Sequence, residues 1–332
     1  MDLHMLARHT ARGFQALAVA AASMSPSAQA ARSAAGFEAR FAPLYATVFS
    51  EGGSFSGRAM SADLQALEPL LKTPGVVARD AFRLYYTQAS VYARRNMPEE
   101  AAKAAGSALA ALPGPQADTE LSYAQFFLRY SGIRWLADAG QHVAALRQVK
   151  AFQALYPLPQ IARLPAEMRW DSSVKPARAL DFPSQMQILG VYEDEGYLLH
   201  ELGRFREARL ANERLLPIAR ARLSAMGKLP QLRGVLTNIA QNCYELGDLK
   251  QAAAYLQERL QIAQTAQDHV TVYDSYFQLM VLAHEQQQEP QARQWLARYE
   301  QYALSQKDSE HQARARELLA ELEQRNARHP GK

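Results

Sequence analysis

The sequence is poor in the features that support disulfide, metal or membrane chemistry. Cys243 is its only cysteine, which excludes an intramolecular disulfide and a cysteine-based metal cage. Beyond the first thirty residues, no stretch approaches the ~18 uninterrupted apolar residues that a membrane span needs. There is no dense basic tract either, because 37 Lys and Arg are matched by 33 Asp and Glu, so we expect no nucleic-acid partner.

Motifs for catalysis are missing as well. The 8 histidines never form a two-histidine zinc motif with an internal glutamate. In "SEGGSFSG", Phe55 stands between Gly53 and Gly57, where a nucleophile elbow needs a serine after a strand. The sequence therefore predicts no enzyme, no metal and no cofactor.

The first thirty residues have the pattern of a targeting segment. Arg8 and Arg12 precede the apolar run "ALAVAAASM", and Ala28 and Ala30 form the small-x-small pattern of a signal-peptidase site. We interpret residues 1–30 as a secretory signal, which predicts a periplasmic or secreted protein. Two alternatives stay open: an Arg-rich organellar presequence, and an alanine-rich first helix of a cytoplasmic protein.

What the chain does contain is a repeated octapeptide, "ELGRFREA" from Glu201 and "ELGDLKQA" from Glu245. Apolar residues recur at helical spacing on both sides of each copy. Gly203 and Gly247 stand where a first helix must end, since glycine accepts the left-handed backbone of a helix terminus. Each octapeptide is thus predicted to be a helix end, a tight turn and a helix start.

These residues resemble the tetratricopeptide repeat family, which has Leu-Gly at its turn and small residues at fixed helix positions. Five copies start near residues 82, 126, 189, 233 and 273, further apart than the family's roughly 34-residue unit. In the fifth copy, Gln287 replaces the turn glycine. The resemblance is closest to the long-repeat subclass found in bacterial sensor and regulatory proteins. It implies an all-α, right-handed superhelical solenoid of antiparallel helix hairpins.

The chain is predicted to divide along these repeats. Prolines from Pro157 to Pro183 forbid one continuous helix and leave open whether that insertion is a packed loop or a hinge. The predicted ranges are 1–30, signal peptide; 31–81, capping helices; 82–157, repeats one and two; 158–184, the proline-rich insertion; 185–305, repeats three to five; and 306–332, a capping helix and tail.

The family usually binds its partners in the groove lined by the first helix of each repeat. Carried onto this sequence, the resemblance implies a peptide-binding groove of Arg83, Tyr86, Arg94, Tyr130, Arg134, Glu193, Tyr197, His200, Gln241, Tyr244 and His284. The same positions in the last repeats hold Glu201, Thr237, Glu245, Asp274, Phe277, Val281 and Glu285. Individual tyrosines in these sets have an alternative role as fillers between helices.

The sequence departs from the family at the positions that bind a peptide's terminal carboxylate, which argues against that mode of binding. Members that clamp the terminal carboxylate of a peptide carry Lys, Asn, Asn, Lys and Arg, but this chain has Glu193, Tyr197, Asn238, Asp274 and Gln278 there. We therefore predict a non-catalytic scaffold that binds a protein or extended peptide and is exported. The alternative is a cytoplasmic, peptide-responsive regulator, and the third hypothesis is an enzyme or nucleic-acid binder. Homo-oligomerisation stays open.

Overall fold

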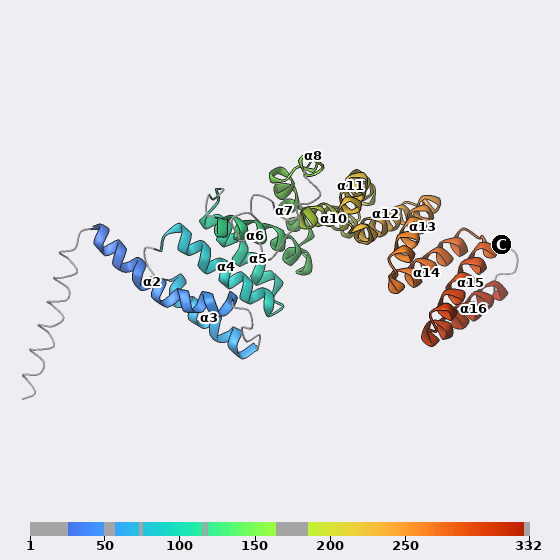
Figure 1. Cartoon of the computed structure of the whole chain (residues 1–332), viewed down its shortest axis with the longest axis horizontal. Coiled ribbons are helices and arrows are strands. Elements are labelled where there is room, and N and C mark those ends of the chain that lie inside the picture. The colour runs from blue at the N-terminus through green and yellow to red at the C-terminus, as the bar shows by residue number, and fades with distance from the viewer. Residues whose placement is uncertain are drawn as a thin grey trace, which may run out of the picture. The chain divides into compact units, whose positions relative to one another are not determined.

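The computed structural model describes residues 26–49, 57–72, 76–114, 116, 119–163 and 185–328 (Figure 1). Within these ranges every regular element is a helix, and no strand occurs. The predicted all-α class is confirmed. Residues 1–25 of the predicted signal, the "SEGGSFS" stretch and residues 164–184 of the insertion lie outside the described ranges.

The chain divides into two compact units, unit 1 (Met1–Ala117) and unit 2 (Asp118–Lys332). Unit 1 contains α2 (Pro26–Phe49), α3 (Gly57–Leu71), α4 (Ala78–Arg94) and α5 (Pro98–Ala111). Unit 2 contains α6 (Thr119–Asp138), α7 (His142–Leu155), α8 (Leu158–Ile161), α10 (Gln185–Glu201), α11 (Phe205–Ala225), η1 (Leu229–Leu232), α12 (Arg233–Glu245), α13 (Leu249–Thr265), α14 (His269–Glu285), α15 (Glu289–Ser305) and α16 (Ser309–Arg328). The predicted boundary after residue 30 lies inside α2.

Unit 2 is a stack of helix hairpins. The pairs α6–α7, α10–α11, α12–α13 and α14–α15 are each joined by a short turn, and the two helices of each pair pack against each other. Successive pairs are linked because α7 packs on α10, α11 on α12, α13 on α14, and α15 on α16. This series, from green to red in Figure 1, is the predicted tetratricopeptide-like solenoid of helix hairpins.

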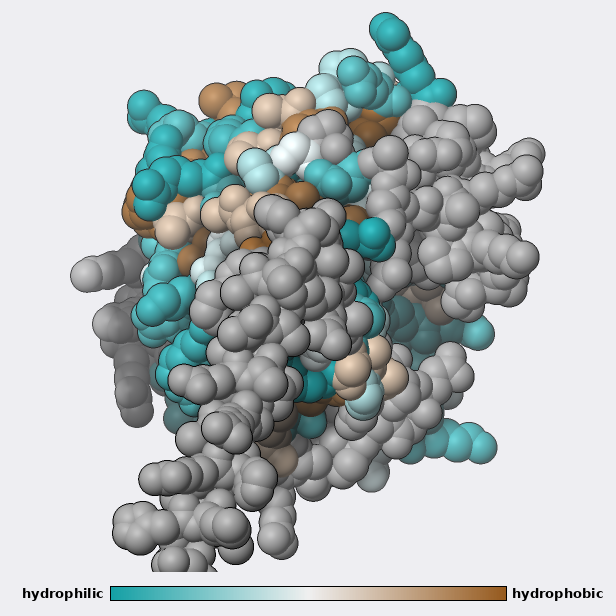
Figure 2. Space-filling view, turned by 90° about the vertical axis from the view of Figure 1, so that its left-hand side faces the viewer, coloured by the Kyte–Doolittle hydropathy of each residue, from teal (hydrophilic) through white to brown (hydrophobic). Residues whose placement is uncertain are grey.

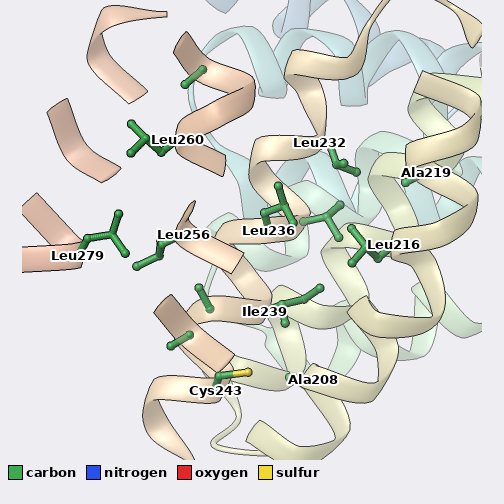
Figure 3. Packing of buried hydrophobic residues seen from close by; sticks show 14 of the residues in the cluster. Ala208, Leu216, Ala219, Leu232, Leu236, Ile239, Cys243, Leu256, Leu260 and Leu279 are labelled. Atoms are coloured by element: carbon green, nitrogen blue, oxygen red, sulfur yellow. The ribbon is translucent and has the colours of Figure 1, made fainter. Parts of the chain in front are cut away.

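Small residues allow the helices of unit 2 to approach closely. Ala208 and Ala252, the last residues of the two octapeptides, are fully buried in α11 and α13. Between them, α12 presents Leu236, Ile239 and Cys243 to the core, as Figure 3 shows. Because interiors are close-packed, these contacts fix the spacing between neighbouring repeats.

The hairpin turns confirm the conformation predicted for the octapeptides. Gly203 and Gly247 have φ of +69° and +75°. At the first turn the Gly203 N–H donates to the His200 carbonyl oxygen, and the Arg204 N–H donates to that of Leu199 (2.8 Å each). The two bonds cap the carbonyls that the helix end leaves unpaired. The octapeptide recurs because each hairpin of this kind needs such a turn.

The fifth repeat makes the same turn without glycine. Gln287 has φ of +59°, and the Gln287 and Gln288 N–H groups donate to the carbonyl oxygens of His284 and Ala283. A side chain in the left-handed region is strained by about 1–2 kcal/mol. Gln287→Gly is therefore expected to raise the free energy of unfolding by about 0.5–1 kcal/mol, after the larger unfolded-state entropy of glycine is subtracted.

Urea unfolding followed by circular dichroism measures this change. The matched control is Gln286→Gly, one residue earlier, where φ is −76° and glycine should be slightly destabilising. A lower stability for Gln287→Gly than for the unchanged chain would contradict the strain argument.

No helix in the described ranges is both long and apolar enough to cross a membrane. Figure 2 views the structure from the left-hand side of Figure 1, and on the described part of that face hydrophilic and hydrophobic residues are interspersed.

Unit 1 has its own small core, in which Phe37 and Phe41 of α2 pack with Leu67 and Leu70 of α3 and Leu84 of α4.

Candidate functional site

Most of the predicted groove residues lie in unit 2, on the first helices of successive hairpins. They are Tyr130 and Arg134 on α6; Glu193, Tyr197 and His200 on α10; Gln241 and Tyr244 on α12; and His284 on α14. All of these except Tyr197 line one of three pockets. Tyr197 is 43% exposed and lines none of the three.

The His200 pocket, of about 250 Å³, lies between α10, α12, α13 and α14. Its floor consists of buried apolar side chains: Ala240, Ala252, Leu256 and Leu282. Its rim is polar or aromatic: His200, Gln241, Tyr244, Glu245, Phe277 and Gln278. An apolar floor with a few polar groups around it is the usual construction of a binding pocket.

A buried amide orients His200 at this rim. Asn242 is fully buried, and its Nδ2 donates to the carbonyl oxygen of Asn238 (2.6 Å). Its Oδ1 is therefore the acceptor for His200 Nδ1–H, at 2.9 Å. In the neutral ring this leaves Nε2 as the acceptor available to a ligand.

The His284 pocket, of about 120 Å³, adjoins the His200 pocket, and Phe277 and Val281 line both. Its outer wall is formed by α16, through Arg314, Leu318, Glu321 and Leu322. Tyr244 Oη donates to Glu285 Oε1 (2.9 Å), which links α12 and α14 beside both pockets. The two pockets thus form one continuous surface over α12, α14 and α16.

The Glu193 pocket, of about 230 Å³, lies further toward the N-terminus of unit 2, between α6, α10, α11 and α12. Arg134 extends across it: its guanidinium lies 5.1 Å from the centre of the Tyr130 ring, and its Nε is 3.7 Å from Asp194 Oδ2. Gly234, near the start of α12, makes room for Glu193, because a Cβ there would lie 2.0 Å from Glu193 Oε1.

Burial shifts the titration of both acidic residues here. It raises the pKa of Glu193 to about 7, and the charge of Asp194 adds to the shift while Arg134 opposes it. Burial likewise raises the pKa of Asp194 to about 6, against the favourable charge of Arg134. Perturbed carboxyl groups in a pocket are characteristic of functional sites.

A buried carboxylate holds α10, the helix that carries most of these residues. Glu195 is 4% exposed and pairs with Lys150 of α7. Gln153 Nε2 also donates to it (2.6 Å), and Arg214 of α11 lies 3.5 Å away. With three partners on two neighbouring helices, this carboxylate fixes the position of α10 between them.

The remaining predicted groove residues belong to unit 1. Arg83 Nη1 donates to Glu38 of α2 (2.9 Å), and its guanidinium lies over Phe41. Tyr86 is 8% exposed and stacks on Phe82, so it packs inside unit 1. Arg94 lies exposed in the last turn of α4. Helix α2 occupies the face on which Arg83 was predicted to meet a ligand.

Some lining residues were missed by sequence reasoning. The pattern of α16 predicts a capping helix and gives no sign of its contribution to the His284 pocket. A fourth pocket of about 400 Å³, the Gln257 pocket, lies between α13, α14 and α15 and includes Lys250, Gln257, Gln286, Gln288, Gln291 and Trp295. The glutamine-rich segment 286–291 is the local sequence signal for this pocket, but its pattern predicts only a turn.

Apolar, aromatic and charged side chains line these pockets. Burial raises the pKa of the Cys243 thiol to about 11, which disfavours the reactive thiolate. In the described ranges, no three His, Cys, Asp or Glu side chains gather where they could hold a metal ion. The arrangement offers apolar floors, aromatic rims and carboxylates.

No protein-family model and no curated protein matches the sequence. Among solved structures, the apo form of RapI is similar at 15% identity and a TM-score of 0.48, covering 77% of this chain and 62% of that one. The Rap conjugation gene regulator of the plasmid pLS20, in complex with the Phr* peptide, is similar at 14% identity and a TM-score of 0.40, covering 84% and 66%. The chain thus spans less than two thirds of either structure. The likeness is distant.

Proposed function

We propose that unit 2 binds an extended peptide, or an extended segment of a protein, along α10, α12 and α14, and that it is not an enzyme. The observation that carries the proposal is the His200 pocket, with its apolar floor and aromatic rim, and its continuity with the His284 pocket. Pockets for drug-sized molecules measure about 300–1,000 Å³. A pocket of about 250 Å³ suits a single large side chain better than a whole small molecule.

The exposed aromatic residues support the same ligand. Tyr197, Tyr244 and Phe277 are 43%, 40% and 37% exposed, and they lie on the consecutive first helices α10, α12 and α14. Aromatic side chains contribute a large contact area at a low entropic cost and are typical of binding hot spots. One such residue per repeat suits a ligand that crosses several repeats in succession.

Peptides selected on the full chain from a phage-displayed library of random 12-residue sequences test the proposal. Phe277→Ala is expected to weaken binding of a selected peptide by about tenfold or more, because it removes an anchor shared by two pockets. Leu304→Ala is the matched control, since Leu304 is 57% exposed on the second helix α15 and lines none of the four pockets described above.

Fluorescence anisotropy with the synthetic peptide gives the two dissociation constants. The proposal is wrong if the library yields no peptide, or if both variants bind as the unchanged chain does.

This function has two forms, an exported scaffold and a cytoplasmic peptide-responsive regulator. The continuity of α2 from Pro26 to Phe49 supports the second form, because a peptidase cut after Ala30 would fall inside this helix, which packs on α3 and α4. The intact mass of the natively expressed protein distinguishes them. Retention of residues 1–30 excludes export by cleavage, and their loss excludes the cytoplasmic form.

A further inference from the structure

Two acceptor groups of the Glu193 pocket lack partners. The Oε1 atom of Gln187 is buried without a hydrogen-bond donor, whereas Asp194 Oδ2, which does not line the pocket, forms an ion pair with Arg134 Nε at 3.7 Å. Among the described residues, none donates a hydrogen bond to the Glu193 carboxylate or forms an ion pair with it. Buried acceptors normally have partners, so the Gln187 oxygen and the Glu193 carboxylate call for a ligand that brings donors.

The charges in and beside the pocket point the same way. Glu193 and Asp194 are two carboxylates on α10, and Asp138 of α6 is close enough to raise the pKa of Asp194. Arg134 is the cation that lines the pocket, and it is already shared between Asp194 and the Tyr130 ring. With Glu193 ionised, the group of residues keeps a net negative charge. One further cation would neutralise Glu193.

From this pocket we infer that the bound peptide inserts a primary ammonium group, from a lysine side chain or from its own N-terminus, against Glu193 and Gln187. The inference rests on the proposed peptide-binding function and specifies the chemistry of one subsite. An ammonium group brings three donors and a positive charge, which suits the unpaired Glu193 carboxylate and the unpaired Gln187 Oε1.

The absence of a side chain at Gly234 makes room for the Glu193 carboxylate. Glu193 Oε1 occupies the space that a side chain at residue 234 would take, so Gly234 lets the carboxylate lie directly against the start of α12. Gly234 therefore brings the carboxylate close to the backbone of α12.

The test uses the same 12-residue phage library on the full chain, on Glu193→Gln and on Glu300→Gln. Glutamine keeps the shape of Glu193 and removes its charge, while Glu300 lies exposed on α15 and serves as the control. We expect peptides selected on the unchanged chain and on Glu300→Gln to be enriched in lysine at one position or to depend on a free N-terminus. On Glu193→Gln this preference should disappear while the apolar preference at other positions remains.

One selected peptide, synthesised in three forms, identifies the source of the ammonium group. At pH 8, replacing lysine by norleucine or acetylating the N-terminus should weaken binding by about tenfold, for whichever group enters the pocket. Neither change should matter to Glu193→Gln. The subsite inference is overturned if peptides bind with no basic preference, or if that preference persists in Glu193→Gln. A library that yields no peptide at all instead overturns the proposed function.

Discussion

Replacing Gly196 with alanine is expected to destabilise unit 2 by about 3 kcal/mol or more, the upper range for overpacking a core. A Cβ at this position of α10 would lie 2.0 Å from Nδ2 and 2.4 Å from Cγ of Asn212. Asn212 is fully buried in α11, so its side chain has nowhere to move. The clash would therefore force α10 and α11 apart, and with them the hairpin that carries His200.

A double-mutant cycle isolates this contact. Both polar atoms of the Asn212 amide are buried without a partner among the described residues. Asn212→Ala thus removes an unsatisfied group as well as packing, and we expect a net change within about 1 kcal/mol. Gly196→Ala combined with Asn212→Ala should recover most of the lost stability in urea unfolding. Additive effects of the two substitutions would show that the clash is not the cause.

The second large effect is a fall in stability between pH 5 and pH 8. The folded-state pKa of Glu193 is about 7, above the unfolded value near 4.3, and that of Asp194 is about 6, above 3.9. A raised carboxyl pKa means that the folded state holds a proton that the unfolded state has released. This contribution is complete below the unfolded pKa and is lost as pH rises through the folded one. We expect a loss on the order of 2–3 kcal/mol for the pair.

Thermal unfolding at pH 5 and pH 8 measures this loss. Glu193→Gln should remove most of it, because glutamine does not titrate, and Glu300→Gln should leave it unchanged. Groups with lowered pKa values, such as Asp268 and Asp308, lose their contribution only below their ordinary range, at more acidic pH. A chain that is equally stable at pH 5 and pH 8 would contradict the burial assigned to Glu193.

Local patterns were sufficient to predict the hairpins. The turn glycines depend only on residues next to them in the chain, so the sequence predicts a left-handed backbone at Gly203 and Gly247. The positive φ angles of both residues agree with this prediction. The same holds for the capping helix predicted within residues 306–332, which is α16. Helical periodicity and capping involve neighbours within a few residues, and these are visible in a sequence.

Burial of a particular groove residue depends on helices that are distant in sequence. Tyr86 and His200 both lie on first helices, yet Tyr86 is buried and His200 borders a pocket. Glu193 and Gly234 are in contact because α10 packs beside α12. The residues next to either one in the sequence do not predict that contact. Repeat position therefore predicts which face of a helix is inner, but not how much of that face stays open.

The side-chain bonds around Glu195 help to align the α6–α7 hairpin with the α10–α11 hairpin. Its bonds to α7 and α11 are joined by another from Tyr192 Oη, which donates to the carbonyl oxygen of Tyr156 at the end of α7 (3.0 Å). The register between α7 and α10 is thus supported by side chains on the helices themselves, so truncating Glu195 would disturb the stacking of one repeat on the next.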